Sequence, residues 1–232
     1  MSQQNNAITD KAKREPVKQT IMIVDDHPLV CKGLEELIKS TLDLEVFAVA
    51  GDAIQTVDIL RKSQPDLVLL DLSLPETSGL DLLKDLQSFF PKLRILVLSL
   101  HDENVHAERV LRAGARGYIM KQESGEKVIE AIRCVLAGNV YASPSLLTRL
   151  LKKLTANGDF KQGAGSPETL ADRELEVYSL IGEGLSSTEI AARLHLSPKT
   201  IQTYREHIKT KLGLKNSVEL TRSAVLWVKA EQ

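Results

Sequence analysis

The sequence predicts an α/β fold with a doubly wound, five-stranded parallel sheet of strand order 2-1-3-4-5, followed by a second, all-α domain of four helices. Residues 20–138 alternate between short apolar runs rich in Val, Ile and Leu and amphipathic helical segments, which is typical of buried parallel strands joined by crossover helices. Residues 168–232 contain helical patterns alone. Two domains of different class are therefore expected.

Five strands and five helices should alternate in the first domain. The predicted strands span residues 20–24, 44–50, 66–71, 94–99 and 117–120. The predicted helices span residues 28–40, 52–63, 79–89, 103–113 and 124–137. Pro28 suits the first turn of the first helix, because a missing N–H costs nothing there. Apolar residues line one face of the first and last of these helices, as a helix that covers a sheet requires: Val30, Leu34, Leu37, Ile38, Val128, Ile129, Ile132, Val135 and Leu136.

Charge is distributed unevenly along the 232 residues, although the net charge is only −1. Residues 21–144 carry 13 Lys and Arg against 19 Asp and Glu, whereas residues 145–166 carry 4 against 1 and residues 167–232 carry 9 against 9. No apolar run approaches the roughly 18 residues that span a membrane, and the N-terminus lacks a signal core, so a cytoplasmic location and no membrane partner are expected. Cys31 and Cys134 are interpreted as buried small apolar residues.

Four segments are expected along the chain. A disordered tail at residues 1–19 precedes a first domain at 20–138, a linker at 139–166 and a second domain at 167–232. The linker should contain a helical segment at 144–154. Gly, Pro and polar residues dominate positions 157–167, and this composition is typical of a connection between domains.

Polar residues come directly after four of the predicted strands: Asp25 with Asp26, then Asp71, Ser99 and Lys121. Parallel strands end at one edge of a sheet, so these side chains should share one crevice. Three carboxylates would repel one another unless a cation neutralised them, and carboxylate oxygens without Cys or His in the set suit Mg²⁺. Lys121 and Ser99 suit phosphoryl oxygens, and Asp71 could act as a nucleophile on phosphorus. The alternative is that strand-end Asp residues cap helices, as Asp26 could do for the helix at 28–40.

This set resembles the receiver domain of bacterial two-component response regulators over residues 20–138. Leu72, Leu74, Pro75 and Gly79 match the family's loop after the phosphorylated Asp, and residues 113–121 match its approach to the last strand.

The resemblance implies roles for the crevice residues. Asp71 would accept the phosphoryl group, and Mg²⁺ would be bound by Asp26, Asp71 and the main-chain carbonyl of Ser73, with Asp25 acting mostly through water. Lys121 would contact the phosphoryl group, Ser99 would turn toward it, and Tyr118 would swing inward behind Ser99. Without the resemblance, Tyr118 would be interpreted as a surface or half-buried aromatic residue.

The second domain contains a predicted helix-turn-helix. Ser186 and Glu189 form a capping box that opens one helix, and Ser197 and Pro198 open the next, which Gly213 ends. Ile201, Tyr204, Ile208 and Leu212 form the inward stripe of that second helix. Its outer face carries side chains that can bind base edges or phosphates, as a recognition helix in the major groove does: Lys199, Thr200, Gln202, Thr203, Glu206 and Lys209. A plain solvated helix face is the alternative.

The pattern from Leu170 to Gly213 resembles the LuxR-type DNA-binding domain, and its combination with a receiver resembles the NarL/FixJ subfamily. The family usually has Thr where Ala171 stands, so Asp172 is expected to cap that helix instead. The resemblance places a dimer contact on the helix at 218–228, where Val218, Thr221, Val225 and Val228 form a stripe.

Together these resemblances imply a phosphorylation-activated transcription regulator and no enzyme. Its expected partners are a sensor histidine kinase, double-stranded DNA and a second copy of the chain when phosphorylated or DNA-bound, with RNA polymerase a further candidate. One alternative is a phosphorylation-independent LuxR-type regulator that uses its receiver as a scaffold. Another is an aspartyl-phosphate hydrolase of the haloacid type, but such enzymes need a second Asp at position 73, where this chain has Ser73.

Overall fold

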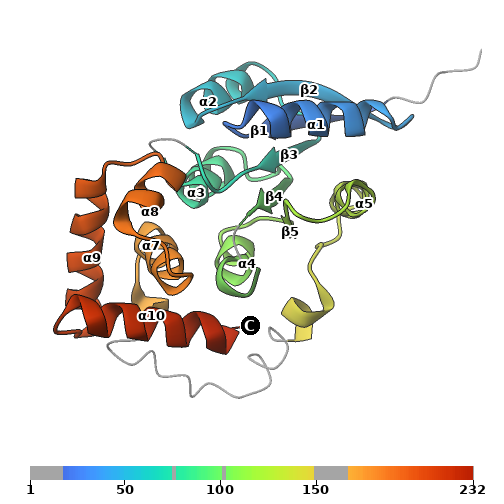
Figure 1. Cartoon of the computed structure of the whole chain (residues 1–232). Coiled ribbons are helices and arrows are strands. Elements are labelled where there is room, and N and C mark those ends of the chain that lie inside the picture. Colours follow the sequence, from blue (N-terminus) through green and yellow to red (C-terminus); the bar gives the residue numbers. More distant parts are fainter. Residues whose placement is uncertain (1–17, 75–76, 101–102, 149–166, 232) are drawn as a thin grey trace, which may run out of the picture.

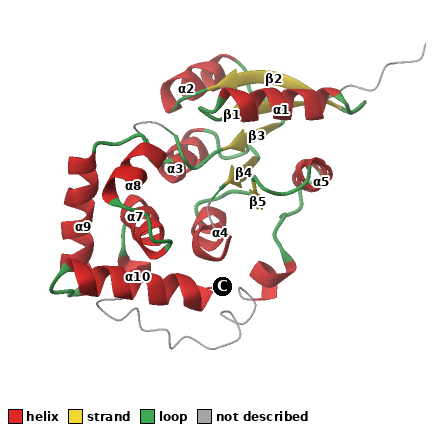
Figure 2. Ribbon diagram, viewed as in Figure 1, coloured by secondary structure: helices red, strands yellow, loops and turns green. Residues whose placement is uncertain are grey.

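The computed structural model describes residues 18–74, 77–100, 103–148 and 167–231 (Figures 1 and 2). The predicted tail up to residue 17, Pro75 and residues 149–166 of the predicted linker lie outside the described residues. Of the helical segment predicted at 144–154, residues 144–148 are helical. No helix in the described part of the chain is both long and apolar enough to cross a membrane.

The first domain is built on a parallel five-stranded sheet of order β2-β1-β3-β4-β5, as predicted. Its strands are β1 (Gln19–Val24), β2 (Leu44–Ala50), β3 (Leu67–Leu70), β4 (Ile95–Ser99) and β5 (Gly117–Met120). The strand order reverses between β1 and β3, because the chain first adds β2 on one side of β1 and then returns to the other. That switch point is where a doubly wound sheet opens a crevice at its carboxyl edge.

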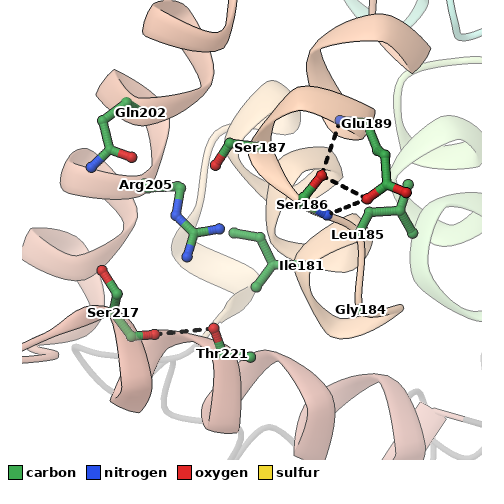
Figure 3. Close-up of a pocket in the computed structure, with 10 residues that line it drawn as sticks. All are labelled: Ile181, Gly184, Leu185, Ser186, Ser187, Glu189, Gln202, Arg205, Ser217 and Thr221. Carbon is green, nitrogen blue, oxygen red and sulfur yellow. Dashed lines mark hydrogen bonds between the residues drawn. The ribbon is translucent and has the colours of Figure 1, made fainter.

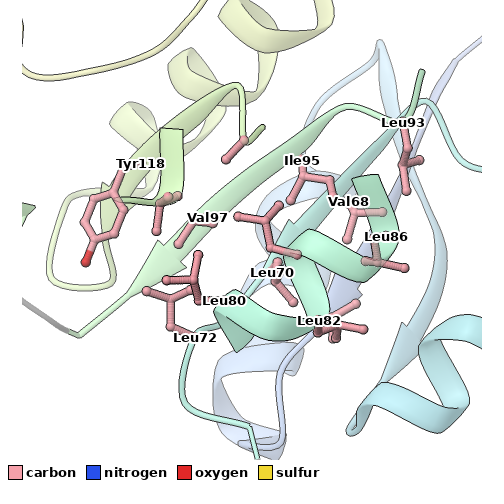
Figure 4. Packing of buried hydrophobic residues seen from close by; sticks show 14 of the residues in the cluster. Val68, Leu70, Leu72, Leu80, Leu82, Leu86, Leu93, Ile95, Val97 and Tyr118 are labelled. Atoms are coloured by element: carbon pink, nitrogen blue, oxygen red, sulfur yellow. The ribbon is translucent and has the colours of Figure 1, made fainter. Parts of the chain in front are cut away.

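Five helices cover the two faces of this sheet. They are α1 (Pro28–Lys39), α2 (Ala53–Lys62), α3 (Gly79–Phe89), α4 (Glu103–Arg112) and α5 (Gly125–Leu136). Alternate residues of β1 show how the faces divide, since Ile21 and Ile23 pack with α1 and α5, whereas Met22 and Val24 pack with α2, α3 and α4. Figure 4 shows the second of these cores, in which strand residues meet leucines of α3 and the ring of Tyr118.

Predicted element ends differ from the observed ones by one or two residues. Strand β1 begins at Gln19, one residue inside the predicted tail, and Asp52 precedes α2 as its N-cap. The prediction for the cysteines is confirmed for Cys31, which is buried, and is wrong for Cys134, which is partly exposed near the C-terminal end of α5.

The second domain consists of a short 3₁₀ turn (Pro167–Thr169) and the helices α7 (Asp172–Gly182), α8 (Ser187–Arg193), α9 (Pro198–Leu212) and α10 (Ser217–Glu231). Ser186 and Glu189 form the predicted capping box of α8, and the Ser197 side chain accepts a hydrogen bond from the N–H of Thr200 to open α9. Gly213 ends α9 with a φ of 68°, a left-handed conformation that favours glycine.

One expectation for this domain is wrong. Asp172 does not cap α7: it is the first residue of the helix, and its carboxylate is engaged by cations of the first domain. Ala171 takes the N-cap position, and the Glu174 carboxylate accepts a hydrogen bond from its N–H at 2.8 Å. Val228, which belongs to the stripe predicted for the dimer contact, packs against Gly182: a Cβ on this glycine would lie 2.5 Å from a valine methyl.

Candidate functional site

The carboxyl edge of the sheet brings the predicted acidic residues together around one lysine. Asp25 and Asp71 come directly after β1 and β3 and are 4% and 2% exposed. The Nζ of Lys121, which comes directly after β5, lies 2.6 Å from Asp25 Oδ2 and 2.7 Å from Asp71 Oδ2. The strand ends therefore produce a buried arrangement of two carboxylates and one ammonium group.

Burial and charge act against each other on these groups. Burial raises the pKa of Asp71; Lys121 opposes this, and the like charge of Asp25 adds to it. Burial lowers the pKa of Lys121, but the carboxylates of Asp71 and Asp25 outweigh that cost and leave its pKa raised. Lys121 is thus a firmly protonated cation, whereas the Asp71 carboxylate gains from any further positive charge.

Two carboxylate oxygens at this edge fit a divalent cation. Asp71 Oδ1 and Asp26 Oδ1 are buried and receive no hydrogen bond, so their lone pairs are not satisfied by the protein. Asp25, Asp26, His27 and Asp71 can each offer a ligand atom, all within 4.8 Å of one another. Because hard carboxylate oxygens dominate this set, it fits the predicted Mg²⁺.

Asp26 does not cap α1, which excludes the alternative interpretation of this residue. The helix begins after His27, and it is Asp25 Oδ1 that accepts the hydrogen bond from the main-chain N–H of His27, at 2.9 Å. The Asp26 carboxylate lies beside imidazoles instead: His27 Nδ1 is 2.8 Å from its Oδ1, and His195 Nε2 is 3.2 Å from its Oδ2.

The remaining predicted receiver residues surround the same edge. Ser99 ends β4 and is fully buried, and its carbonyl accepts a hydrogen bond from the N–H of Lys121 at 2.8 Å. Tyr118 on β5 is 1% exposed, so its ring already occupies an inward position (Figure 4). Ser73 lies two residues beyond Asp71, in the loop that leads to Gly79. A Cβ at Gly79 would lie 2.4 Å from the carbonyl oxygen of Asp71, so only glycine permits this close approach.

The second domain docks on the first through polar contacts that sequence reasoning did not predict. Arg109 on α4 donates hydrogen bonds to the Leu170 carbonyl at 2.9 Å and to Asp172 Oδ1 at 3.0 Å. Lys84 on α3 pairs with the other oxygen of Asp172. His195, in the turn between α8 and α9, reaches Asp26. Figure 1 shows the resulting arrangement, with α7 and α8 beside α3 and α4.

The predicted DNA-contacting residues lie together on one side of α9. Lys199, Gln202, Thr203 and Glu206 are exposed, whereas Ile201 and Ile208 are buried in the core of the domain. Figure 1 shows α9 on the side of its domain that faces away from the sheet, so docking leaves these side chains uncovered.

Several of these polar side chains form hydrogen bonds or ion pairs with one another. Gln202 Nε2 donates to Glu206 Oε1 at 3.0 Å, and Lys209 Nζ lies 2.9 Å from Glu206 Oε2. Thr200 contributes its N–H to the N-cap at Ser197. The residues predicted to read bases and to contact phosphates therefore stabilise α9 in the absence of DNA.

Arg205, which sequence reasoning passed over, projects into an open pocket of about 430 Å³ between α8, α9 and α10 (Figure 3). Serine and threonine hydroxyls surround it, among them those of Ser186, Ser187 and Thr221. Burial lowers the pKa of the Arg205 guanidinium. The sequence pattern did not single out Arg205, because this residue lies between the inward stripe of α9 and the face assigned to DNA.

Comparison with protein families matches both halves of the chain. Residues 21–133 match the response regulator receiver domain, and residues 168–224 match the luxR family of bacterial regulatory proteins. The two matches correspond to the sheet domain and to the helical domain.

Known proteins with the same organisation are similar along most of the chain. The oxygen regulatory protein NreC of Staphylococcus aureus (strain MRSA252) is 36% identical over 208 residues, covering 88% of this chain and 96% of that protein. The RcsB response regulator of Salmonella typhimurium matches in structure with a TM-score of 0.61 and 27% identity, over 90% of this chain and 98% of that one. A LuxR-family response regulator from Aurantimonas sp. SI85-9A1 matches with a TM-score of 0.55 and 31% identity, over 59% of this chain and 98% of that one.

The receiver-like crevice, the helix-turn-helix and the family matches over both domains lead to one conclusion. The chain belongs to the NarL/FixJ-type response regulators, the DNA-binding members of two-component systems that regulate transcription through a receiver and a LuxR-type domain.

Proposed function

We propose that Asp71 is the phosphoacceptor and that a sensor histidine kinase supplies the phosphoryl group from a phosphohistidine. This proposal rests on the different surroundings of the two Asp71 oxygens. The Nζ of Lys121 lies 2.7 Å from Oδ2, whereas the buried Oδ1 receives no hydrogen bond. One carboxylate oxygen of Asp71 attacks phosphorus while the other stays available to the metal ion; a P–O bond forms as the P–N bond breaks, and the imidazole nitrogen keeps the electron pair.

Asp26, Asp71 and the main-chain carbonyl of Ser73 would hold the metal ion, with Asp25 acting through water. A bound Mg²⁺ supplies positive charge that neutralises phosphoryl oxygens. Asp25 keeps Lys121 in position at 2.6 Å, and the Lys121 ammonium remains beside Asp71 to pair with the transferred group. Ser99 turns its hydroxyl toward that group, and Tyr118 fills the space behind it.

Phosphorylation then acts on the docked second domain. The domain is held by Lys84 on α3, by Arg109 on α4 and by Asp26, and Asp26 lies at the carboxyl edge of the sheet where the phosphoryl group arrives. Because α9 stays uncovered while docked, release does not serve to expose it. Release instead lets two copies of the domain reorient and pair through α10, where Val218 and Thr221 are already exposed in the docked arrangement.

The paired domains read DNA through the outer face of α9. Gln202, Thr203 and Glu206 contact base edges, and Lys199 and Lys209 contact phosphates, with Thr200 at the start of the helix. RcsB of Salmonella enterica has been determined bound to promoter DNA in the presence of a phosphomimetic, and this supports the same coupling here. Residues 167–232 carry 9 Lys and Arg against 9 Asp and Glu, so pairing two domains must supply much of the affinity.

A test with acetyl phosphate and Mg²⁺ separates this proposal from its rivals. A regulator of this kind should retain one acyl phosphate at Asp71 and then bind DNA more tightly. Rapid turnover would indicate a hydrolase. Stable phosphorylation without any change in DNA binding would indicate a receiver that serves as a scaffold.

A further inference from the structure

Two histidines and one carboxylate meet where the domains touch, and phosphoryl transfer uses neither histidine. We propose that Asp26, His27 and His195 form a binding site for a divalent transition-metal ion of the zinc class, which bridges the receiver and the DNA-binding domain. The site is distinct from the Mg²⁺ site but shares Asp26 with it, and it does not depend on phosphorylation of Asp71.

The three ligands already have nearly the spacing that such an ion needs. His27 Nδ1 lies 2.8 Å from Asp26 Oδ1, and His195 Nε2 lies 3.2 Å from Asp26 Oδ2. One ligand atom from each residue falls within 4.8 Å of the others. A tetrahedral zinc ion with bonds of about 2.0–2.1 Å places its ligands about 3.3 Å apart, so side-chain rotations suffice to close the site.

The charge around Asp26 leaves a place for this ion. Lys121 lies against Asp25 and Asp71, whereas the groups beside the Asp26 carboxylate are two imidazoles. Asp26 Oδ1 is buried and receives no hydrogen bond, although His27 Nδ1 is only 2.8 Å away. His27 Nδ1 is hydrogen-bonded to Asp25 Oδ1 at 3.0 Å, so an ion at this site would replace that hydrogen bond, and the nitrogen and Asp26 Oδ1 could then both turn their lone pairs toward it.

The site is also open to solvent and held in place by the turn. The side chains of His27 and His195 are 43% and 44% exposed, which leaves an entry path and room for a water as fourth ligand. His195 has a φ of 54°, and no other described residue except glycine has a positive φ. This left-handed conformation costs most residues stability and presents the imidazole at the tip of the turn, toward the receiver.

Ligand chemistry selects the class of metal. Imidazole nitrogens suit Zn²⁺, Ni²⁺ and Cu²⁺, whereas Mg²⁺ prefers oxygen ligands alone. Because His195 belongs to one domain and Asp26 and His27 to the other, the ion binds the docked arrangement better than the open one and so stabilises it. Mg²⁺ at the receiver site competes for Asp26 and opposes that effect.

Co²⁺ is a suitable probe, since four-coordinate Co²⁺ with imidazole ligands absorbs visible light far more strongly than six-coordinate Co²⁺. The tag-free full chain is titrated as wild type, His195→Asn, His27→Asn and His207→Ala. Asn tolerates the left-handed conformation at position 195 and is a favourable N-cap at position 27, so both variants keep the fold. His207 is an exposed histidine of α9 and provides the matched control.

We expect one Co²⁺ per chain with strong visible bands, displaced by Zn²⁺ and weakened by millimolar Mg²⁺. Each Asn variant should lose at least about tenfold in affinity together with those bands, and His207→Ala should bind as wild type does. Small-angle scattering should show that Zn²⁺ compacts the wild type but not His195→Asn. Weak bands of six-coordinate Co²⁺ alone, full binding by His195→Asn, or equal loss in His207→Ala would each overturn the proposal.

Discussion

Asp172 offers the sharpest test of how the two domains are coupled. Its carboxylate accepts from Arg109 at 3.0 Å and pairs with Lys84, so one residue of α7 is held by both α3 and α4. Replacing it by Asn keeps the shape and one acceptor oxygen but removes the charge. We therefore expect Asp172→Asn to favour the undocked arrangement without unfolding either domain.

The size of the effect depends on the exposure of the partners. The side chains of Arg109 and Asp172 are 22% and 18% exposed, whereas that of Lys84 is 50% exposed, so solvent screens the second pair more than the first. Partly exposed ion pairs contribute about 0.2–1 kcal/mol each, and two of them give about 0.5–2 kcal/mol. The ratio of undocked to docked chains should then rise by about 2- to 30-fold.

Small-angle scattering of the unphosphorylated chain measures that ratio, and fluorescence anisotropy with operator DNA measures its consequence. Asp172→Asn should have a larger radius of gyration and bind DNA more tightly than the wild type before phosphorylation. Asp81→Asn is the matched control, because it removes the same charge from beside Lys84, at 3.4 Å, without contacting the second domain. If both variants behave as the wild type does, these ion pairs do not hold the domains together.

Three further predictions concern the phosphorylation site, the metal site and the DNA-binding face. Asp71→Asn should abolish the phosphoryl adduct that mass spectrometry detects after acetyl phosphate treatment; because burial raises the pKa of Asp71, the neutral side chain should leave thermal stability equal or higher. Asp26→Ala should weaken Mg²⁺ binding more than Asp25→Ala does, and equal losses in a titration would contradict the assignment of the direct ligand. Gln202→Ala should change the preferred base at one half-site position by about 1–3 kcal/mol of discrimination, whereas Lys209→Ala should lower affinity evenly and flatten its salt dependence in a binding-site selection.

Periodicity and strand endings were sufficient to predict the fold and the receiver crevice. The meeting of Asp25, Asp71 and Lys121 was predictable because parallel strands must end at one edge, whatever the loops between them do, and the strand order was predictable because doubly wound sheets adopt only a few common orders. Caps such as Ser197 were predictable because they depend on residues only three positions away.

Contacts between the domains could not be predicted in this way, because they join residues that no local pattern relates. Asp172 resembles an N-cap in the sequence, yet its carboxylate turns to Arg109, 63 positions earlier in the chain, since a largely buried cation competes better for it than main-chain N–H groups do.

His27 was overlooked for another reason. It comes directly after the Asp pair, but His195 lies in the turn of a different domain, so the cluster of Asp26, His27 and His195 exists only when the domains are docked. The residue expected to bind Mg²⁺ is therefore also the residue that contacts His195 of the helix-turn-helix, so we expect Mg²⁺ binding and domain docking to compete at Asp26.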